Sequence, residues 1–155
     1  MQTLRIEIPK GHEVESFDKS TGVIKFKETP KDITERIKTF TDVLEHLNID
    51  EDDFVDRIED MTEDEAAYVK IKLIVRTLNE GWVPDWSNSS QYKYYPWFRM
   101  GSSSGVGFSF DGGGRWNAYS YCGSRLCFKS RELAVYAGEQ FENIYKDYLT
   151  LNSNS

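Results

Sequence analysis

The sequence predicts an α+β fold in which helices pack on one face of an antiparallel sheet. Three observations predict it. Strand patterns and helix patterns are segregated along the chain, in the order strands, helices, strands, helix. A capped helical pattern ends at a glycine, and aromatic runs separated by glycines follow it. Segregated strands and helices are typical of α+β proteins.

The length and composition predict one folded domain. The chain has 155 residues, of which 39% are hydrophobic and 14% aromatic, too many for a disordered segment. We expect a single domain over residues 1–151. Its parts are an N-terminal hairpin (1–30), a helical segment (31–81), an aromatic β-meander (82–129) and a C-terminal helix (130–150), before a tail at 152–155.

The first elements are two strands and a helical stretch. Residues 4–8 and 23–27 alternate apolar and polar side chains, which predicts a hairpin. Apolar residues at helical spacing follow over 33–47, where Thr39 and Asp42 could start a second helix. This stretch is one helix or a kinked pair. The acidic residues 50–60 allow one or two amphipathic turns.

A helix over 62–81 is marked at both ends. Thr62 and Glu65 have the spacing of a capping box, and Gly81 stands where a C-terminal glycine belongs. One face is apolar and consists of Ala67, Ile71, Ile74 and Leu78.

The remainder predicts a meander and a last helix. Aromatic runs at 92–100, 106–110, 116–122 and 125–129 are separated by turn residues at 101–105, 111–114 and 123–124. Ser130 caps a helix whose apolar face is Leu133, Ala137, Phe141, Ile144 and Tyr148. The whole chain is expected to contain three to four helices.

Charge and aromatic residues are unevenly distributed. The formal net charge is −7, yet residues 82–131 carry six basic and two acidic side chains. Of the 22 aromatic residues, 13 lie between Trp82 and Phe128, including all four tryptophans. Aromatic rings therefore coincide with the locally basic part of an acidic protein.

Strand alternation places rings and cations on one face. In 92–100, Lys93, Tyr95, Trp97 and Arg99 share a face opposite Tyr92, Tyr94, Phe98 and Met100. Platforms for single-stranded nucleic acid use rings for bases and cations for phosphates, and sugars also stack on Trp and Tyr. The alternative is that helices or a second protomer cover both faces. The candidate ligand-binding residues are Trp86, Tyr95, Trp97, Arg99, Arg115, Trp116, Tyr119 and Tyr121.

Three short motifs resemble functional sites but lack a residue or a spacing that each site needs. Val55 occupies the sixth position of a possible calcium loop at 50–56, where glycine is needed. The glycine-serine loop at 101–107 lacks the Lys-Ser/Thr and the helix of a phosphate-binding loop. Neither His12 nor His46 has the spacing of a metal or nucleophile site. We expect no metal, no cofactor and no catalytic residues.

The two cysteines fall near a predicted turn. A two-residue turn at 124–125 would set Cys122 opposite Cys127, whereas a turn at 123–124 would separate them. Cytoplasmic thiols stay reduced, which favours two packed thiols over a redox pair.

Several blocks carry a family resemblance. The segments 78–90, 91–98 and 123–133, with 6–11 and 23–26 at the start, resemble small uncharacterised proteins of phages, prophages and mobile elements of gut bacteria. The resemblance covers most of the chain, and 50–60 is its least typical part. It implies a genomic setting and no particular reaction.

These observations predict a non-enzymatic binding or accessory module for single-stranded nucleic acid or a glycan. The alternative is an interaction or structural module that binds its own copy, a virion protein or a host protein. An enzyme with a site built from distant residues comes third. The chain has no long apolar run, and its start alternates, so we expect neither a membrane span nor an export signal, and a location in the cytoplasm of a bacterial host.

Overall fold

The computed structural model describes residues 6–9, 12–28 and 32–151. In these residues the chain forms six helices and two antiparallel two-stranded sheets, which confirms the α+β class. The hairpin and the aromatic strands form separate sheets. The chain divides into two units, Met1–Asp32 and Ile33–Ser155, and each is described by itself. The single domain over 1–151 stays a prediction.

The first unit is a hairpin of β1 (His12–Phe17) and β2 (Ile24–Glu28). The expected first strand was misplaced: residues 4 and 5 lie outside the described residues, and 6–8 form no strand. The reason is the turn, where the Asp18 carboxylate accepts hydrogen bonds from the hydroxyl (2.6 Å) and amide (2.8 Å) of Ser20. These bonds lower the pKa of Asp18 to about 2. This local turn pairs the strands immediately beside it.

The second unit begins with three short helices. Helices α1 (Ile33–Arg36) and α2 (Phe40–His46) form the kinked pair, because Thr39 and Asp42 make a capping box between them. Helix α3 (Glu51–Ile58) starts at the Asp50 cap. The acidic stretch is therefore a two-turn helix.

Helix α4 (Glu63–Leu78) has the predicted start, with the Thr62 amide donating to Glu65 Oε2 at 2.9 Å. Its apolar face is buried. The helix ends at Asn79, whose buried amide donates to the Cys127 carbonyl at 2.8 Å and accepts from the Lys129 amide at 2.9 Å. Gly81, with φ of 83°, lies two residues beyond this cap.

The C-terminal helix is two helices, α5 (Arg131–Gln140) and α6 (Glu142–Leu149), which meet at Phe141. Ser130 caps the first as expected, with its hydroxyl accepting from the Leu133 amide at 3.3 Å. Gly138 of α5 faces the sheet so closely that a Cβ there would lie 2.5 Å from the Phe110 ring.

The predicted aromatic meander has too many strands. The structure has β3 (Lys93–Arg99) and β4 (Ser109–Trp116), with a single bridge from Tyr94 to Phe128. Residues 111–114, expected as a turn, lie inside β4, and 117–122 form a loop. The glycines suggested a turn because glycine is common in turns. Here Gly112, Gly113 and Gly114 instead pair with Trp97, Pro96 and Tyr95 inside the strand.

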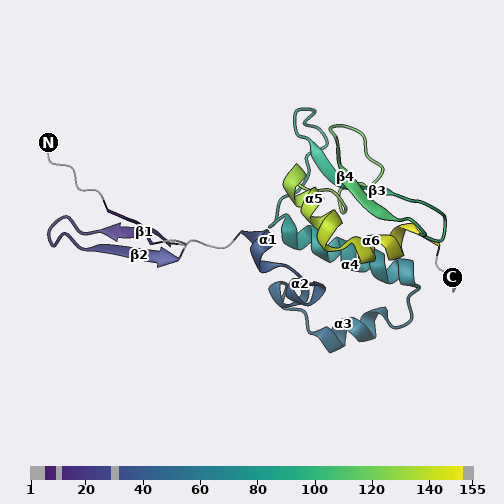
Figure 1. Ribbon diagram of the computed structural model, residues 1–155, viewed down its shortest axis with the longest axis horizontal. Coiled ribbons are helices and arrows are strands. Elements are labelled where there is room, and N and C mark those ends of the chain that lie inside the picture. Colours follow the sequence, from purple (N-terminus) through teal and green to yellow (C-terminus); the bar gives the residue numbers. More distant parts are fainter. Residues whose placement is uncertain (1–5, 10–11, 29–31, 152–155) are drawn as a thin grey trace. The chain divides into compact units, whose positions relative to one another are not determined.

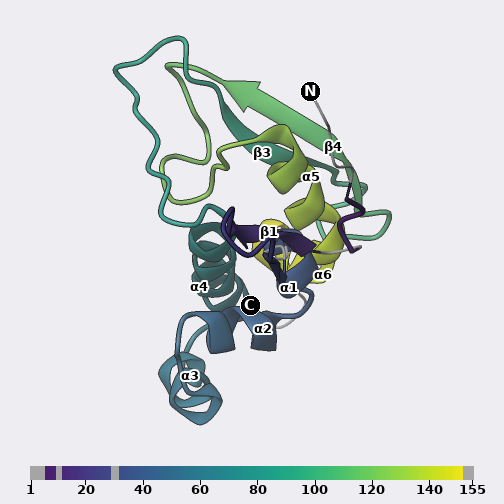
Figure 2. The same cartoon turned by 90° about the vertical axis from the view of Figure 1, so that its left-hand side faces the viewer.

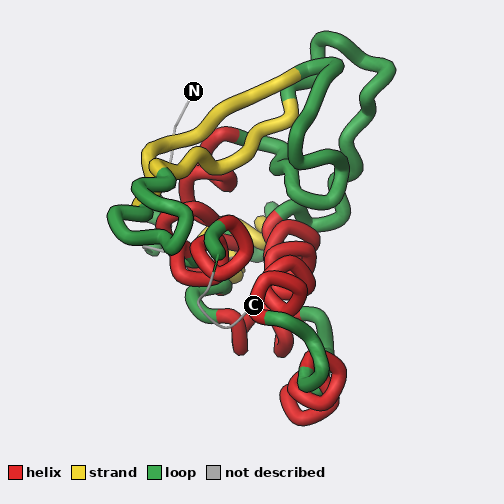
Figure 3. The backbone as a smooth tube through the Cα atoms, turned by 90° about the vertical axis from the view of Figure 1, so that its right-hand side faces the viewer, coloured by secondary structure: helices red, strands yellow, loops and turns green. Residues whose placement is uncertain are grey.

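The second unit is layered. Strands β3 and β4 lie over α5 and α6, with α4 beneath these helices and α2 and α3 on the side away from the strands (Figures 1 and 2). The buried core lies between α1, α2, α4, α5, α6 and the segment around Phe128. Figure 3 shows long loops extending beyond the ends of the two strands, and the loop between β4 and α5 contributes Tyr121, Cys122 and Leu126 to the site below.

Candidate functional site

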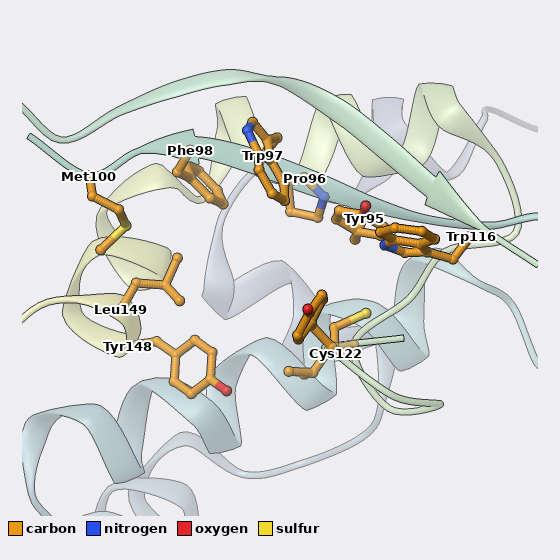
Figure 4. A pocket seen from close by; sticks show the side chains of 11 residues that line it. Tyr95, Pro96, Trp97, Phe98, Met100, Trp116, Cys122, Tyr148 and Leu149 are labelled. Carbon is orange, nitrogen blue, oxygen red and sulfur yellow. The ribbon is translucent and has the colours of Figure 1, made fainter. Parts of the chain in front are cut away.

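A cleft of about 330 Å³ lies beside β3. Figure 4 shows Met100, Phe98, Trp97 and Tyr95 following the strand on one side, with Tyr148 and Leu149 across the opening. We call it the aromatic cleft. It is lined by Tyr95, Pro96, Trp97, Phe98, Met100, Trp116, Tyr121, Cys122, Leu126, Tyr148 and Leu149.

A glycine of β4, Gly114, allows the Tyr95 ring to lie close against the strand. Gly114 pairs with Tyr95, and a Cβ on Gly114 would lie 2.6 Å from the Tyr95 ring. Any other residue at this position would push the ring away. Tyr95 in turn lies beside Trp97, with ring centroids 5.9 Å apart. Gly114 thus positions the Tyr95 ring of the aromatic wall.

The cleft is open to solvent and its lining is neutral. Trp97 is 56% exposed and Trp116 is 40% exposed, so neither is covered by a helix. Burial raises the pKa of Tyr95 and of Cys122, which keeps both groups protonated at neutral pH. Among the eleven lining residues there is no Asp, Glu, Lys, Arg or His.

Four of the eight candidate residues line the aromatic cleft: Tyr95, Trp97, Trp116 and Tyr121. Tyr119 is 78% exposed outside it. Trp86 is part of a loop contact, since its indole Nε1 donates to Ser124 Oγ at 2.7 Å.

The two candidate arginines lie away from the cleft lining. Arg99 Nη2 is 3.7 Å from Asp111 Oδ1, and the Arg115 guanidinium lies 4.1 Å from the centroid of the Tyr92 ring. The expected juxtaposition of rings and phosphate-binding cations is therefore absent from this cleft as the described residues form it.

Lys93 was expected to present its charge to solvent beside Tyr95 and Trp97. This expectation is wrong, because Lys93 is only 1% exposed. Its ammonium donates to the carbonyls of Asp85, Gln91 (2.7 Å), Asn117 (3.1 Å) and Asn88 (3.3 Å), and lies 5.1 Å from the Trp86 ring centroid. The alternation placed Lys93 on the face of Tyr95, but two loops close over it. Lys93 holds these loops together and is not available to a ligand.

Sequence reasoning missed the far wall of the cleft. Tyr148 and Leu149 come from α6, and Leu126 and Cys122 come from the loop before α5. Tyr148 was assigned to the apolar face of the last helix, which is where it lies, but no local pattern indicated that this face borders β3. Cys122 and Cys127 are free thiols, half-buried and buried respectively.

Comparison with protein-family models, with curated proteins and with solved structures finds no match to this chain. The resemblance to phage and mobile-element proteins therefore stays a prediction.

Among the described residues, no group of three or more His, Cys, Asp or Glu side chains could hold a metal ion. No helix in that part of the chain is long and apolar enough to span a membrane.

Proposed function

We propose that this protein is a non-enzymatic binding module that holds an apolar, ring-bearing group of a partner protein in the aromatic cleft. The observation that carries the proposal is the lining, which is aromatic and aliphatic and has no charged side chain. The buried centres of protein interfaces are enriched in Trp, Tyr and Met and depleted of charge. Exposed Trp97 and Trp116 match that composition.

The same lining favours an apolar group over the two ligands expected first. Single-stranded nucleic acid needs cations beside the rings, and neither candidate arginine lines the cleft. A sugar placed here would exchange water for few hydrogen-bonding partners, which costs free energy for each hydroxyl group. An apolar side chain gives up no hydrogen bonds when it leaves water, and its transfer into an apolar cleft is favourable.

The test is a titration of the ¹⁵N-labelled protein with N-acetyl-tryptophanamide, followed by NMR. We expect the indole N–H signals of Trp97 and Trp116 to shift with a dissociation constant in the millimolar range, as befits one side chain. Trp82 and Trp86 lie outside the lining and are internal controls, with signals that stay in place.

Two comparison ligands separate the alternatives. Oligothymidylate and a chitin trisaccharide should leave all four indole signals unchanged. Shifts with oligothymidylate that weaken steeply with salt would instead indicate nucleic-acid binding. Equal small shifts of all four signals with the amide would remove the cleft as a binding site.

A further inference from the structure

The aromatic cleft is surrounded by rings from several segments of the chain. Six of its eleven lining residues are aromatic, and they come from β3, the end of β4, the loop after it and α6: Tyr95, Trp97, Phe98, Trp116, Tyr121 and Tyr148. The Tyr95 and Trp97 rings, with centroids 5.9 Å apart, are tilted by 55°, so their faces meet at an angle. Figure 4 shows Tyr148 across the opening from β3. A group in the cleft therefore contacts rings on more than one side.

The ring faces of the cleft have no cation over them among the described residues. Aromatic faces carry partial negative charge and attract cations that lie within about 6 Å of the ring centroid. The structure contains such cation–ring contacts in its described part, and their rings are those of Phe40, Tyr68, Trp86, Tyr92 and Tyr136. None of these rings lines the cleft. The cleft thus presents ring faces to a cation from outside the chain.

The neutral lining selects the kind of cation. A primary ammonium keeps its N–H groups hydrogen-bonded, as Lys93 does by donating to four loop carbonyls. The cleft has no carboxylate among its lining residues to serve in that way. A quaternary ammonium has no N–H group, and its methyl groups suit the apolar side chains of Met100, Leu126 and Leu149. Aromatic surroundings are a recurrent means of binding such groups.

Charged groups around the cleft leave the ring faces as the main attraction for a cation. Tyr95 and Trp97 also line a second hollow, which contains one acid and one base, Asp111 and Arg131, whose charges offset one another. The basic side chains of residues 82–131 are absent from the cleft lining. At longer range, the net charge of −7 attracts cations to the protein. Charge complementarity therefore favours a cationic ligand over an anionic one.

We infer that the aromatic cleft also binds a quaternary ammonium group, the chemistry shared by choline and by the side chain of trimethylated lysine. The faces of Tyr95 and Trp97 hold the charge, and the aliphatic side chains of the lining contact the methyl groups. The inference goes beyond the proposed function, because it assigns the cleft a cationic ligand in addition to an apolar ring.

The experiment compares ligands of one shape on the ¹⁵N-labelled full-length protein. Choline is titrated against neohexyl alcohol, in which a carbon atom replaces the nitrogen and removes the charge. Choline should shift the indole signals of Trp97 and Trp116 and bind about fivefold more tightly than the alcohol, because only choline is attracted to the ring faces. Equal or tighter binding of the alcohol would overturn the inference.

Ethanolamine tests the selection for methyl groups. It carries the same charge on a primary ammonium and should bind about tenfold more weakly than choline, because its N–H groups lose water without gaining acceptors. Equal binding of ethanolamine and choline would show that net charge, and not the cleft, attracts both, and would also overturn the inference.

Two leucine variants test the ring. Trp97→Leu keeps an apolar side chain, and should weaken choline about fivefold while changing the affinity for neohexyl alcohol less than about twofold. Tyr119→Leu removes an exposed ring outside the cleft and should leave both affinities unchanged. The Trp116 signal reports binding in both variants. Equal weakening of both ligands by Trp97→Leu would reduce the site to shape alone and contradict the inference.

A last comparison separates the sources of the group and the two proposals. Tighter binding of N-acetyl-trimethyl-lysine amide than of choline assigns the group to a modified protein, and any other order of the two assigns it to a small molecule or head group. If N-acetyl-tryptophanamide binds and neither quaternary ligand does, the inference fails while the proposed function stands. If only the quaternary ligands bind, the proposed function fails. If none binds, both fail.

Discussion

Lys93 shows how a single residue can escape sequence analysis. Strand alternation assigned it correctly to the face of Tyr95 and Trp97, but exposure depends on loops whose course no local pattern gives. The loop carbonyls of Asp85, Gln91 and Asn117 surround the ammonium. A charged group is stable in that position only because carbonyl oxygens replace its water.

Replacing Lys93 by Met should lower the free energy of unfolding by about 2 to 4 kcal/mol, because several carbonyls lose a charged donor. Trp86, which lies over the ammonium, should become more accessible to acrylamide. Lys129→Met is the control, since Lys129 forms an exposed ion pair with Glu80 at 3.1 Å, and about 1 kcal/mol or less is expected there. Equal losses in urea unfolding would contradict the account.

Tyr145 has a buried hydroxyl without a hydrogen-bond partner among the described residues. Removing such a group removes a desolvation cost, so Tyr145→Phe should leave stability unchanged or raise it by about 1 kcal/mol. Tyr136→Phe is the matched comparison, because the Tyr136 hydroxyl donates to the Ile37 carbonyl at 2.5 Å, and its loss should cost about 1 kcal/mol. Thermal unfolding measures both, and a large loss for Tyr145→Phe would refute the assignment.

The two thiols should react in a fixed order. Burial raises the pKa of Cys127 to about 12 and also raises that of Cys122, so at pH 8 both are less ionised than a free thiol. Cys122 lines the cleft and Cys127 is fully buried. Iodoacetamide should therefore modify Cys122 slowly and Cys127 only on unfolding, as peptide mass spectrometry would show. Early modification of Cys127 would rule out this packing.

At the scale of elements, the predictable parts are those that local chemistry determines. The capping boxes at Thr39 and Thr62 are read from a few neighbouring residues, and both helix starts are where the sequence places them. Strand β4 was missed because its glycines suit both a turn and a strand. The pairing strand decides between these, since the Tyr95 ring of β3 covers Gly114, where β4 has no side chain.

Adjacent glycines in β4 give a matched test of this role. Gly114→Ala should displace the Tyr95 ring and change the near-ultraviolet circular dichroism, because the new Cβ would lie 2.6 Å from the ring. Gly113→Ala should preserve the spectrum, since its Cβ would meet Val135 at an ordinary 3.4 Å. The same spectrum for both variants would show that the ring does not depend on Gly114.

At the scale of the molecule, the cleft could be predicted only in part. Half of the candidate residues line it, because ring content marks the strands. The other wall comes from α6 and the loop before α5, and its contribution depends on long-range packing. The two candidate arginines, Arg99 and Arg115, are not among the residues that line the cleft.

The second unit should fold without the first, whereas the first should not fold alone. Both buried apolar clusters consist of residues between Ile33 and Tyr145, so a fragment of residues 33–155 should fold with the helical circular dichroism and NMR signals of the full chain. A peptide of residues 1–32 should be largely unfolded alone, because a two-stranded hairpin is marginal in water. An unfolded 33–155 fragment would show that the first unit is needed for the fold.

Gly138 is expected to be retained even where other positions of the chain change. Helix α5 approaches β3 and β4 to a separation at which even a methyl group would strike Phe110 and Pro96. Distant kin that share this architecture, whatever their overall divergence, are therefore expected to keep glycine at this turn of the helix, and the glycine beneath Tyr95 as well. Together the two positions form a fingerprint for tracing ancestry.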